Sequence, residues 1–167
     1  IKEEQYNEFY KFISNTEDTP LFRLHTSAEA PIQFSSILYC PSTNYETYGF
    51  KKLEHGLELY SNKILIQPDC KMLLPEYLRF IRGVVDSADI PLNISRETFQ
   101  DNRMIQKMKS ILVKQIITLL QELDKNEKAK YETFWNQFGR ILKEGVHFDF
   151  ENRDLLAQLM RFNSSQC

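Results

Sequence analysis

The sequence RFIRGVVDSADIPLNISRETFQ, from Arg79 to Gln100, joins a part of the chain with mixed helix and strand patterns to a part with helical patterns only. An apolar segment through Val84 and Val85 is followed by turn-forming residues, which indicates a short strand that leaves a packed sheet and enters a loop. The loop carries Arg96 close to the expected start of the next helix. Because a guanidinium is always charged and its planar fork can bind two oxygens, Arg96 is a candidate ligand for phosphate.

The residues before this stretch combine helical and strand patterns. Aromatic and aliphatic residues at helical spacing predict a helix over residues 2–13. Pro75 is expected at the first position of a short helix, which Gly83 ends. Alternating patterns predict three strands, namely Phe22–Thr26, Gln33–Cys40 and Leu57–Gln67, the last with a bulge near Ser61 and Asn62.

After residue 100 the pattern is helical throughout. Three helices are predicted from apolar residues at helical spacing: one from Met104 to Leu123, one through Tyr131, Phe134, Trp135 and Phe138 that ends at Gly145, and one from Glu151 to Arg161. We therefore predict an α/β (α+β) fold, with a larger α/β subdomain over residues 1–100 and a helical segment over residues 101–167.

The bulk composition fits a globular protein and argues against two classes of partner. The 167 residues, of which 42% are hydrophobic and 26% charged, are enough for one sizeable core. A formal net charge of −2 and a pI near 6.0 argue against a nucleic-acid-binding protein. Lys114 interrupts the most apolar helical run, so no stretch has the length of a membrane span. Neither nucleic acid nor a membrane is expected as a partner.

The sequence contains little of the chemistry of a self-contained enzyme. Cys40, Cys70 and Cys167 are far apart and form no CxxC pair, and the histidines are scattered, so no metal site is predicted. Cys40 ends an apolar strand, where a buried and inert thiol is expected. No glycine belongs to a phosphate-binding loop and no serine lies in a GxSxG motif, so the chain alone is not expected to hold a nucleotide.

Two interpretations of Arg96 remain open on this evidence. The arginine could pair within the chain with Asp86, Asp89 or Glu97, and the pattern alone favours this structural role. Positive charge is disfavoured at a helix N-terminus because of the helix dipole, so an arginine placed there also indicates an external anion.

The segment from Ser42 to Gly56 has turn chemistry, yet it carries Tyr45, Tyr48 and Phe50. A loop does not easily bury three aromatic side chains. Either this segment folds back onto its own sheet, or it offers an apolar surface to another protein.

Several stretches resemble the ninety-kilodalton heat-shock chaperone family, over essentially the whole chain. VVDSADIPLNISRETFQ resembles the segment that joins the family's middle-domain sheet to its following helices. Further similar stretches are IKEEQYNEFYKFISN (1–15), FSSILYCP (34–41), LLPEYLRFIRG (73–83) and KYETFWNQFGRILKEGVHFDFENRDLLAQLMRFNSS (130–165). LELYSNKILIQ resembles the bacterial (high-temperature protein G) and mitochondrial branches. Because the chain also opens on Ile1 within a helical pattern, we expect a middle-domain piece of a longer protein.

The resemblance implies an α-β-α sandwich followed by a helical segment, in a homodimeric, ATP-driven chaperone that assists protein folding in the stress response. It implies that ATP and Mg²⁺ are bound by an N-terminal domain outside this chain, with client proteins and cochaperones as further partners. The full-length protein would be an ATPase, whereas this fragment alone is not expected to hydrolyse ATP. The expected location is the cytoplasm, with the mitochondrial matrix as the alternative.

The resemblance also implies roles for particular residues. Arg96 matches the arginine that reaches the γ-phosphate of ATP held by the N-terminal domain of the same chain. Gln100 matches the glutamine that assists on that loop, and Asn93 a neighbouring asparagine. Where the family carries a second proline followed by Phe-Asp, this chain has STNYETYGF (42–50), so we expect Tyr45, Tyr48 and Phe50 to substitute as the client or cochaperone contact.

Two other functions remain open. A stand-alone interaction module would bind partners through the aromatic loop and a helical face, with Arg96 in a structural salt bridge. An autonomous hydrolase is a third possibility, against which the lack of a nucleophile–base spacing and of a phosphate loop argues.

Overall fold

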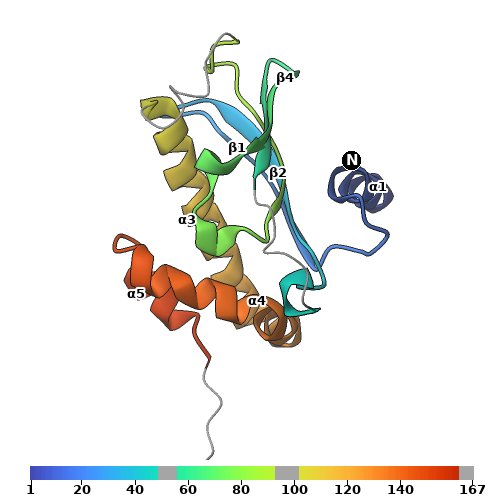
Figure 1. Cartoon of the computed structure of the whole chain (residues 1–167), viewed down its shortest axis with the longest axis vertical. Coiled ribbons are helices and arrows are strands. Elements are labelled where there is room, and N and C mark those ends of the chain that lie inside the picture. The colour runs from blue at the N-terminus through green and yellow to red at the C-terminus, as the bar shows by residue number, and fades with distance from the viewer. Residues whose placement is uncertain (49–55, 93–101, 162–167) are drawn as a thin grey trace, which may run out of the picture.

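A five-stranded sheet forms the centre of the computed structural model, which describes residues 1–48, 56–92 and 102–161 (Figure 1). The strands, in spatial order, are β1 (Phe22–Ala28), β2 (Phe34–Cys40), β5 (Arg82–Asp86), β3 (Leu57–Ser61) and β4 (Ile64–Cys70). All neighbours pair antiparallel except β3 and β5, which are parallel. The short strand expected around Val84 and Val85 therefore lies at the middle of the sheet.

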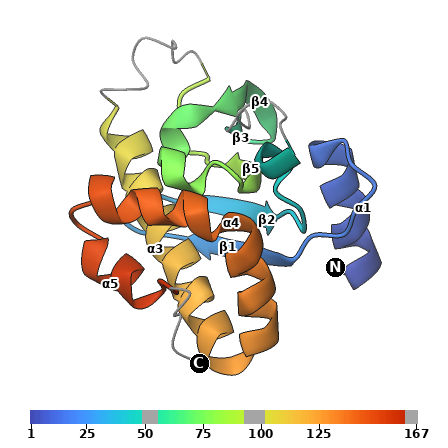
Figure 2. The ribbon, with the colours of Figure 1, turned by 60° about the horizontal axis from the view of Figure 1, so that its bottom comes forward.

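Helices cover both faces of this sheet. The described helices are α1 (Glu3–Ser14), α3 (Arg103–Asn126), α4 (Lys128–Phe148) and α5 (Arg153–Gln158), with one-turn 3₁₀ helices η1 (Tyr45–Tyr48), η2 (Lys71–Leu73) and η3 (Glu76–Leu78). Figures 1 and 2 show α1 on one side of the sheet and α3, α4 and α5 on the other. This arrangement confirms the mixed α/β fold with helices on both faces, followed by a helical segment.

The alternation of side chains along β2 explains the two faces. Tyr39 points toward α1, where its hydroxyl donates to the Tyr6 carbonyl at 2.8 Å and its ring packs 5.2 Å from that of Tyr10. Ser36 points the opposite way, and its β1 neighbour Thr26 donates to Gln115 of α3 at 2.9 Å. Successive residues of a strand face opposite sides, so one strand anchors both helical layers.

One buried cluster unites the sheet with the C-terminal helices. Phe22 of β1 packs against Phe134 of α4, and Phe80 stacks on Phe138 with ring centroids 4.5 Å apart. Trp135 of the same helix is only partly buried against this cluster. The cluster contains residues from both sides of residue 100, while the division into subdomains at that position remains a prediction.

The expectation of one bulged strand over Leu57–Gln67 is wrong, because the chain makes a hairpin there. β3 ends at Ser61 and β4 begins at Ile64, with Asn62 (φ 50°) and Lys63 (φ 66°) forming the turn between them. Two consecutive left-handed residues are the conformation of a two-residue hairpin turn, whose twist matches that of the flanking strands.

The two glycines expected to end helices instead lie within regular elements. Gly83 belongs to β5 with φ 151°, and a Cβ there would lie 2.2 Å from the Ile37 carbonyl oxygen of β2. Gly145 is buried inside α4, where a Cβ would lie 2.8 Å from the Tyr77 ring. Both positions need glycine for close packing rather than for chain termination. The short helix expected at Pro75 is a single 3₁₀ turn, with Pro75 preceding it.

Candidate functional site

The residues predicted to act on ATP fall outside the part of the chain that the structure describes. Asn93, Arg96 and Gln100 all lie in the segment 93–101, and Phe50 lies in the segment 49–55. What the structure does describe is the protein on either side of these segments, and these flanking regions define how residues 93–101 are attached.

The sheet-side flank of residues 93–101 is held by hydrogen bonds to two segments, the one just before β2 and the end of β3. Ser87 donates to the Gln33 carbonyl at 2.6 Å, and the Gln33 amide donates to Asp89 at 2.9 Å. Ser61 donates to the Ile90 carbonyl at 2.6 Å, and the Ile90 side chain is buried. The turn after β5 is therefore fixed against both β2 and the β3 end of the sheet.

Of the three carboxylates considered as partners of Arg96, Asp86 and Asp89 lie within the described residues, and both accept from backbone amides. Asp86 receives the Lys63 amide of the β3–β4 turn at 3.2 Å, and Asp89 receives the Gln33 amide. These contacts are of the kind expected for acidic residues in turns, where a short side chain satisfies a nearby backbone donor.

The helix-side flank is fixed by a helix cap. The Asn102 side chain accepts from the backbone amides of Met104 and Ile105, at 2.8 and 3.3 Å. This satisfies two of the amide groups that a helix N-terminus leaves without an intrahelical partner. Ile105 and Met108 are buried in the core, so α3 is anchored from its first turn. Residues 93–101 thus follow a turn whose Ile90 side chain is buried and precede a capped helix whose first turn contains the buried Ile105.

Tyr45 is the one member of the aromatic trio whose side chain the structure describes. It is half-buried and lines a cavity of about 440 Å³ together with Tyr10, Pro41 and Arg82. Burial raises the pKa of the Tyr45 hydroxyl, and the nearby Asp18 carboxylate adds to the effect. Tyr45 therefore lies beside α1, whereas the side chain of Tyr48 and all of Phe50 lie outside the described residues. A client or cochaperone contact by the trio remains a prediction.

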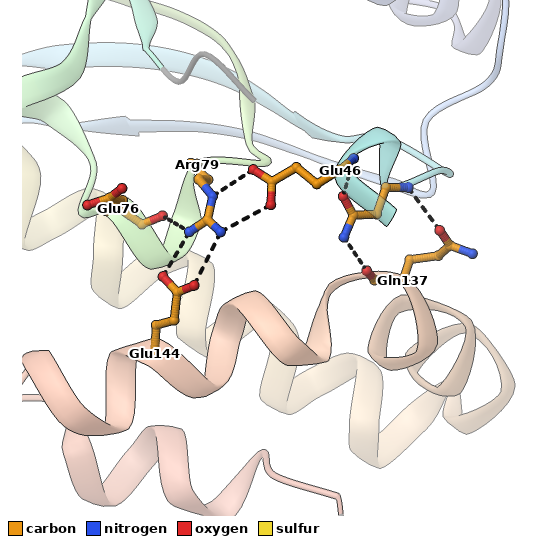
Figure 3. A network of polar contacts seen from close by, with 6 residues as sticks. Glu46, Glu76, Arg79, Gln137 and Glu144 are labelled. Carbon is orange, nitrogen blue, oxygen red and sulfur yellow. Dashed lines mark hydrogen bonds and ion pairs between the residues drawn. The ribbon is translucent and has the colours of Figure 1, made fainter. Parts of the chain in front are cut away.

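A buried ion network that the sequence patterns did not reveal fixes the start of this aromatic segment (Figure 3). Arg79, which is 5% exposed, donates to Glu46 of η1 at 2.9 and 3.1 Å and to Glu144 of α4 at 2.8 and 3.2 Å. A fifth bond, to the Glu76 carbonyl at 3.1 Å, uses the last of the five guanidinium donors. Burial lowers the pKa of Arg79, but the two carboxylates outweigh it and hold that pKa above its ordinary value.

A second polar clamp lies beside the first. The Asn44 backbone amide donates to the Gln137 side chain of α4, and the Asn44 side chain donates to the Gln137 carbonyl, both at 2.8 Å.

The only indication of the ion network in the sequence was Arg79 itself, a charged residue between the apolar Leu78 and Phe80. Its partners are distant in sequence, so no local pattern could have identified them.

The remaining predictions on metals, thiols and membranes concern chemistry away from this network. Cys40 and Cys70 are buried free thiols, and burial raises the pKa of Cys40, as expected for an inert thiol. Within residues 1–48, 56–92 and 102–161, no cluster of His, Cys, Asp and Glu side chains is suited to a metal ion. No helix in these ranges is both long and apolar enough to cross a bilayer.

Comparison with known proteins gives a consistent result over the full sequence. A family model described as "Hsp90 protein" matches residues 1–167. "Chaperone protein HtpG" of Desulfitobacterium hafniense is 46% identical over 166 residues, which are 99% of this chain and 27% of that protein. "TNF receptor-associated protein 1 homolog, mitochondrial" of Dictyostelium discoideum is 47% identical over 165 residues, 99% of this chain and 23% of that protein.

A third relative, "Chaperone protein HtpG" of Coxiella burnetii, is 44% identical over 165 residues, 99% of this chain and 26% of its own length. The chain thus spans about a quarter of the length of the curated relatives it matches. Because the family model covers every residue of the sequence, the chain belongs to the Hsp90 family.

Proposed function

We propose that this chain is the middle domain of an ATP-driven chaperone of the Hsp90 family, which assists the folding of client proteins as a full-length homodimer. The observation that carries this proposal is the match of the family model to all 167 residues, together with relatives named as HtpG chaperones. The 27% share of the first of these relatives fits one domain of a longer polypeptide. The sequence PLNISRE of this chain, residues 91–97, is the most specific part of the resemblance to the family.

Arg96 is the residue of this chain that we assign to ATP hydrolysis. Its guanidinium would bind the γ-phosphate of ATP held by the N-terminal domain of the same polypeptide, with Gln100 and Asn93 assisting on the same segment. The planar fork of an arginine suits phosphate oxygens, and a fixed cation stabilises the charge that spreads over them in the transition state. ATP, bound with Mg²⁺, supplies the bond that is hydrolysed, and this chain contributes the positively charged guanidinium of Arg96.

The attachment of residues 93–101 supports this assignment. A catalytic side chain has to be held by rigid surroundings if it is to reach a site built by another domain. The buried Ile90 on one side and the Asn102 cap on the other supply such surroundings. Hydrolysis would then wait for docking of the two domains, because the cation and the nucleotide belong to separately moving bodies.

The decisive experiment is the Arg96→Ala substitution in the full-length protein. ATP affinity should stay within about threefold, whereas turnover should fall by at least about tenfold, a smaller effect than the roughly thousandfold or more of the best-measured arginine fingers. Arg96→Lys should restore only part of the rate, since a lysine lacks the bidentate fork. Arg140→Ala, which removes an exposed arginine of α4, serves as the matched control and should leave turnover unchanged. Unchanged turnover in Arg96→Ala would refute the assignment.

The second candidate is an interaction module in which Arg96 has only a structural role. The exposed aromatic side chains Phe148 and Phe150 favour binding to other proteins. Thermal unfolding of the 167-residue chain separates the candidates. Arg96→Ala should change its stability by less than about 0.5 kcal/mol if the arginine serves ATP, and by clearly more if it holds a structural salt bridge.

The location follows the named relatives and is part of the proposal. HtpG proteins come from bacteria, and the Dictyostelium discoideum relative is named as mitochondrial. We propose the bacterial cytoplasm, with the mitochondrial matrix as the alternative. Fractionation of cells that express the natural gene distinguishes the two.

A further inference from the structure

A cavity of about 580 Å³ opens between η3, the first half of α3 and the end of α4. Its lining includes the connection from α4 to α5. Figures 1 and 2 show this connection on the other side of the sheet from α1. We call it the α4–α5 groove, defined by Tyr77, Val113, Glu144, Phe148, Phe150 and Glu151. It is defined by described residues only, and none of these is assigned to ATP hydrolysis.

Two aromatic side chains form an exposed apolar rim on this groove. Phe148 is 78% exposed and Phe150 is 76% exposed, and only one residue separates them in the sequence. Neighbouring exposed aromatic side chains on a folded protein indicate a surface that contacts another molecule, because water solvates such a patch poorly.

The Phe150 ring is held in place rather than left free. The Arg153 guanidinium lies 4.4 Å from the centre of that ring, and Arg153 also donates to the Val146 carbonyl of α4 at 2.8 Å. A partner that packs on a ring already ordered in this way loses less conformational entropy on binding.

The charges of the groove favour a cationic partner. Its wall contains four carboxylates and one ammonium group, contributed by Glu76, Glu144, Asp149, Glu151 and Lys109. The Glu144 carboxylate is already paired with Arg79, so the negative charge offered to a partner comes from the others. The Asp149 carboxylate is fixed by hydrogen bonds from Tyr77 and Asn152, which hold it in a set position on the wall. The Glu151 side chain is 70% exposed, and its carboxylate lies 3.7 Å from the ammonium group of Lys114, whose side chain is 60% exposed. Complementary charge guides a partner to such a surface and fixes its orientation.

We propose that the α4–α5 groove binds an extended basic segment of a partner protein, in which lysine or arginine residues alternate with apolar ones. In an extended segment successive side chains point to opposite sides. Apolar residues can therefore pack on Phe148 and Phe150 while the cations reach the carboxylates of the wall. This inference depends on neither Arg96 nor ATP.

The test measures binding of a fluorescent peptide in which lysine alternates with leucine, by anisotropy, to both the 167-residue chain and the full-length protein. Binding is expected to both, to weaken with added salt, and to exceed that of a peptide in which glutamate replaces lysine. Phe148→Ser/Phe150→Ser should weaken it by at least about tenfold, since aromatic anchors dominate interfaces. Glu151→Lys should weaken it several-fold, and more strongly at low salt.

Phe12→Ser is the matched control, because Phe12 is 81% exposed but lies on α1, away from the groove. It should leave affinity unchanged. Equal weakening by Phe12→Ser, or undiminished binding by the double variant, would overturn the proposal. So would binding to the chain but not to the full-length protein, which would mean that another part of the polypeptide covers the groove. Light scattering of the 167-residue chain tests a second copy as the occupant. If the chain dimerises and Phe148→Ser/Phe150→Ser abolishes the dimer, the proposal is overturned.

Discussion

Replacement of Arg79 by alanine tests whether the buried ion network holds the η1 segment onto α4. The substitution removes all five hydrogen bonds of the guanidinium and leaves the Glu46 and Glu144 carboxylates facing each other without their shared cation. Two like charges at one site repel, and each has lost the group that compensated its burial.

The size of the effect follows from the exposure of the two carboxylates. Removal of one partner from a fully buried ion pair costs about 3–5 kcal/mol. The Glu46 side chain is 17% exposed, whereas that of Glu144 is 40% exposed and can turn toward water. We therefore expect a loss of about 2–3 kcal/mol, which corresponds to a fall in Tm of roughly 4–12 °C for a chain of this size.

Urea unfolding followed by the fluorescence of Trp135, the single tryptophan of the chain, measures this loss directly. Arg140→Ala, at an exposed position on the same helix as Glu144, should change stability by less than about 0.5 kcal/mol. The combined variant Arg79→Met with Glu46→Gln and Glu144→Gln should recover part of the loss, because it leaves no buried charge unpaired. A loss below about 1 kcal/mol for Arg79→Ala would refute this account of the network.

Two further variants test the elements on either side of residues 93–101, and a pH series tests the burial of three tyrosines elsewhere in the core. Gly83→Ala should cost more than about 2 kcal/mol in urea unfolding, because its Cβ would collide with the Ile37 carbonyl at a positive φ; a milder effect would mean that β5 shifts easily. Asn102→Ala should cost about 1 kcal/mol while Asn102→Asp retains the cap, and equal losses in both would contradict the capping role. Burial raises the pKa of Tyr10, Tyr39 and Tyr131 to about 12, against 10 when unfolded, so the unfolded state loses these protons first. Stability should therefore fall as pH rises from about 10 to 12, in step with phenolate absorbance, and a flat profile would contradict this.

Local patterns were sufficient for the amphipathic helices, whose apolar residues recur at helical spacing. The helix expected over residues 2–13 is α1, and the apolar stripe that starts near Met104 is α3. The patterns were insufficient at Asn62 and Lys63, because a hairpin turn without glycine resembles a continuous strand. They also misjudged Gly145, whose role depends on Tyr77, a residue that is distant in sequence.

The candidate sites also differ in whether the sequence alone could identify them. The roles of Asn93, Arg96 and Gln100 came from resemblance, because no spacing in this chain builds a phosphate site. The Arg79 network joins residues that are 33 and 65 positions apart in sequence, so only the folded chain reveals it. Exposure of Phe148 could not be predicted either, since an aromatic residue near a helix end more commonly belongs to the core.

The Arg79 network and the proposed α4–α5 groove meet on one helix. Glu46 and Asn44 tie the start of the aromatic segment to α4, so that Tyr45 is placed relative to the C-terminal helices. The α4–α5 groove adjoins this network on the same helix, because Glu144 belongs to both. A partner that binds there contacts the helix that also holds the Arg79 network, through Glu144.

The most direct measurement is a structure of the full-length protein with a non-hydrolysable ATP analogue bound. Our account predicts that the guanidinium of Arg96 lies about 3 Å from an oxygen of the terminal phosphate, within hydrogen-bond distance. If every domain is docked in that structure and the guanidinium instead pairs with a carboxylate of its own domain, the account is contradicted.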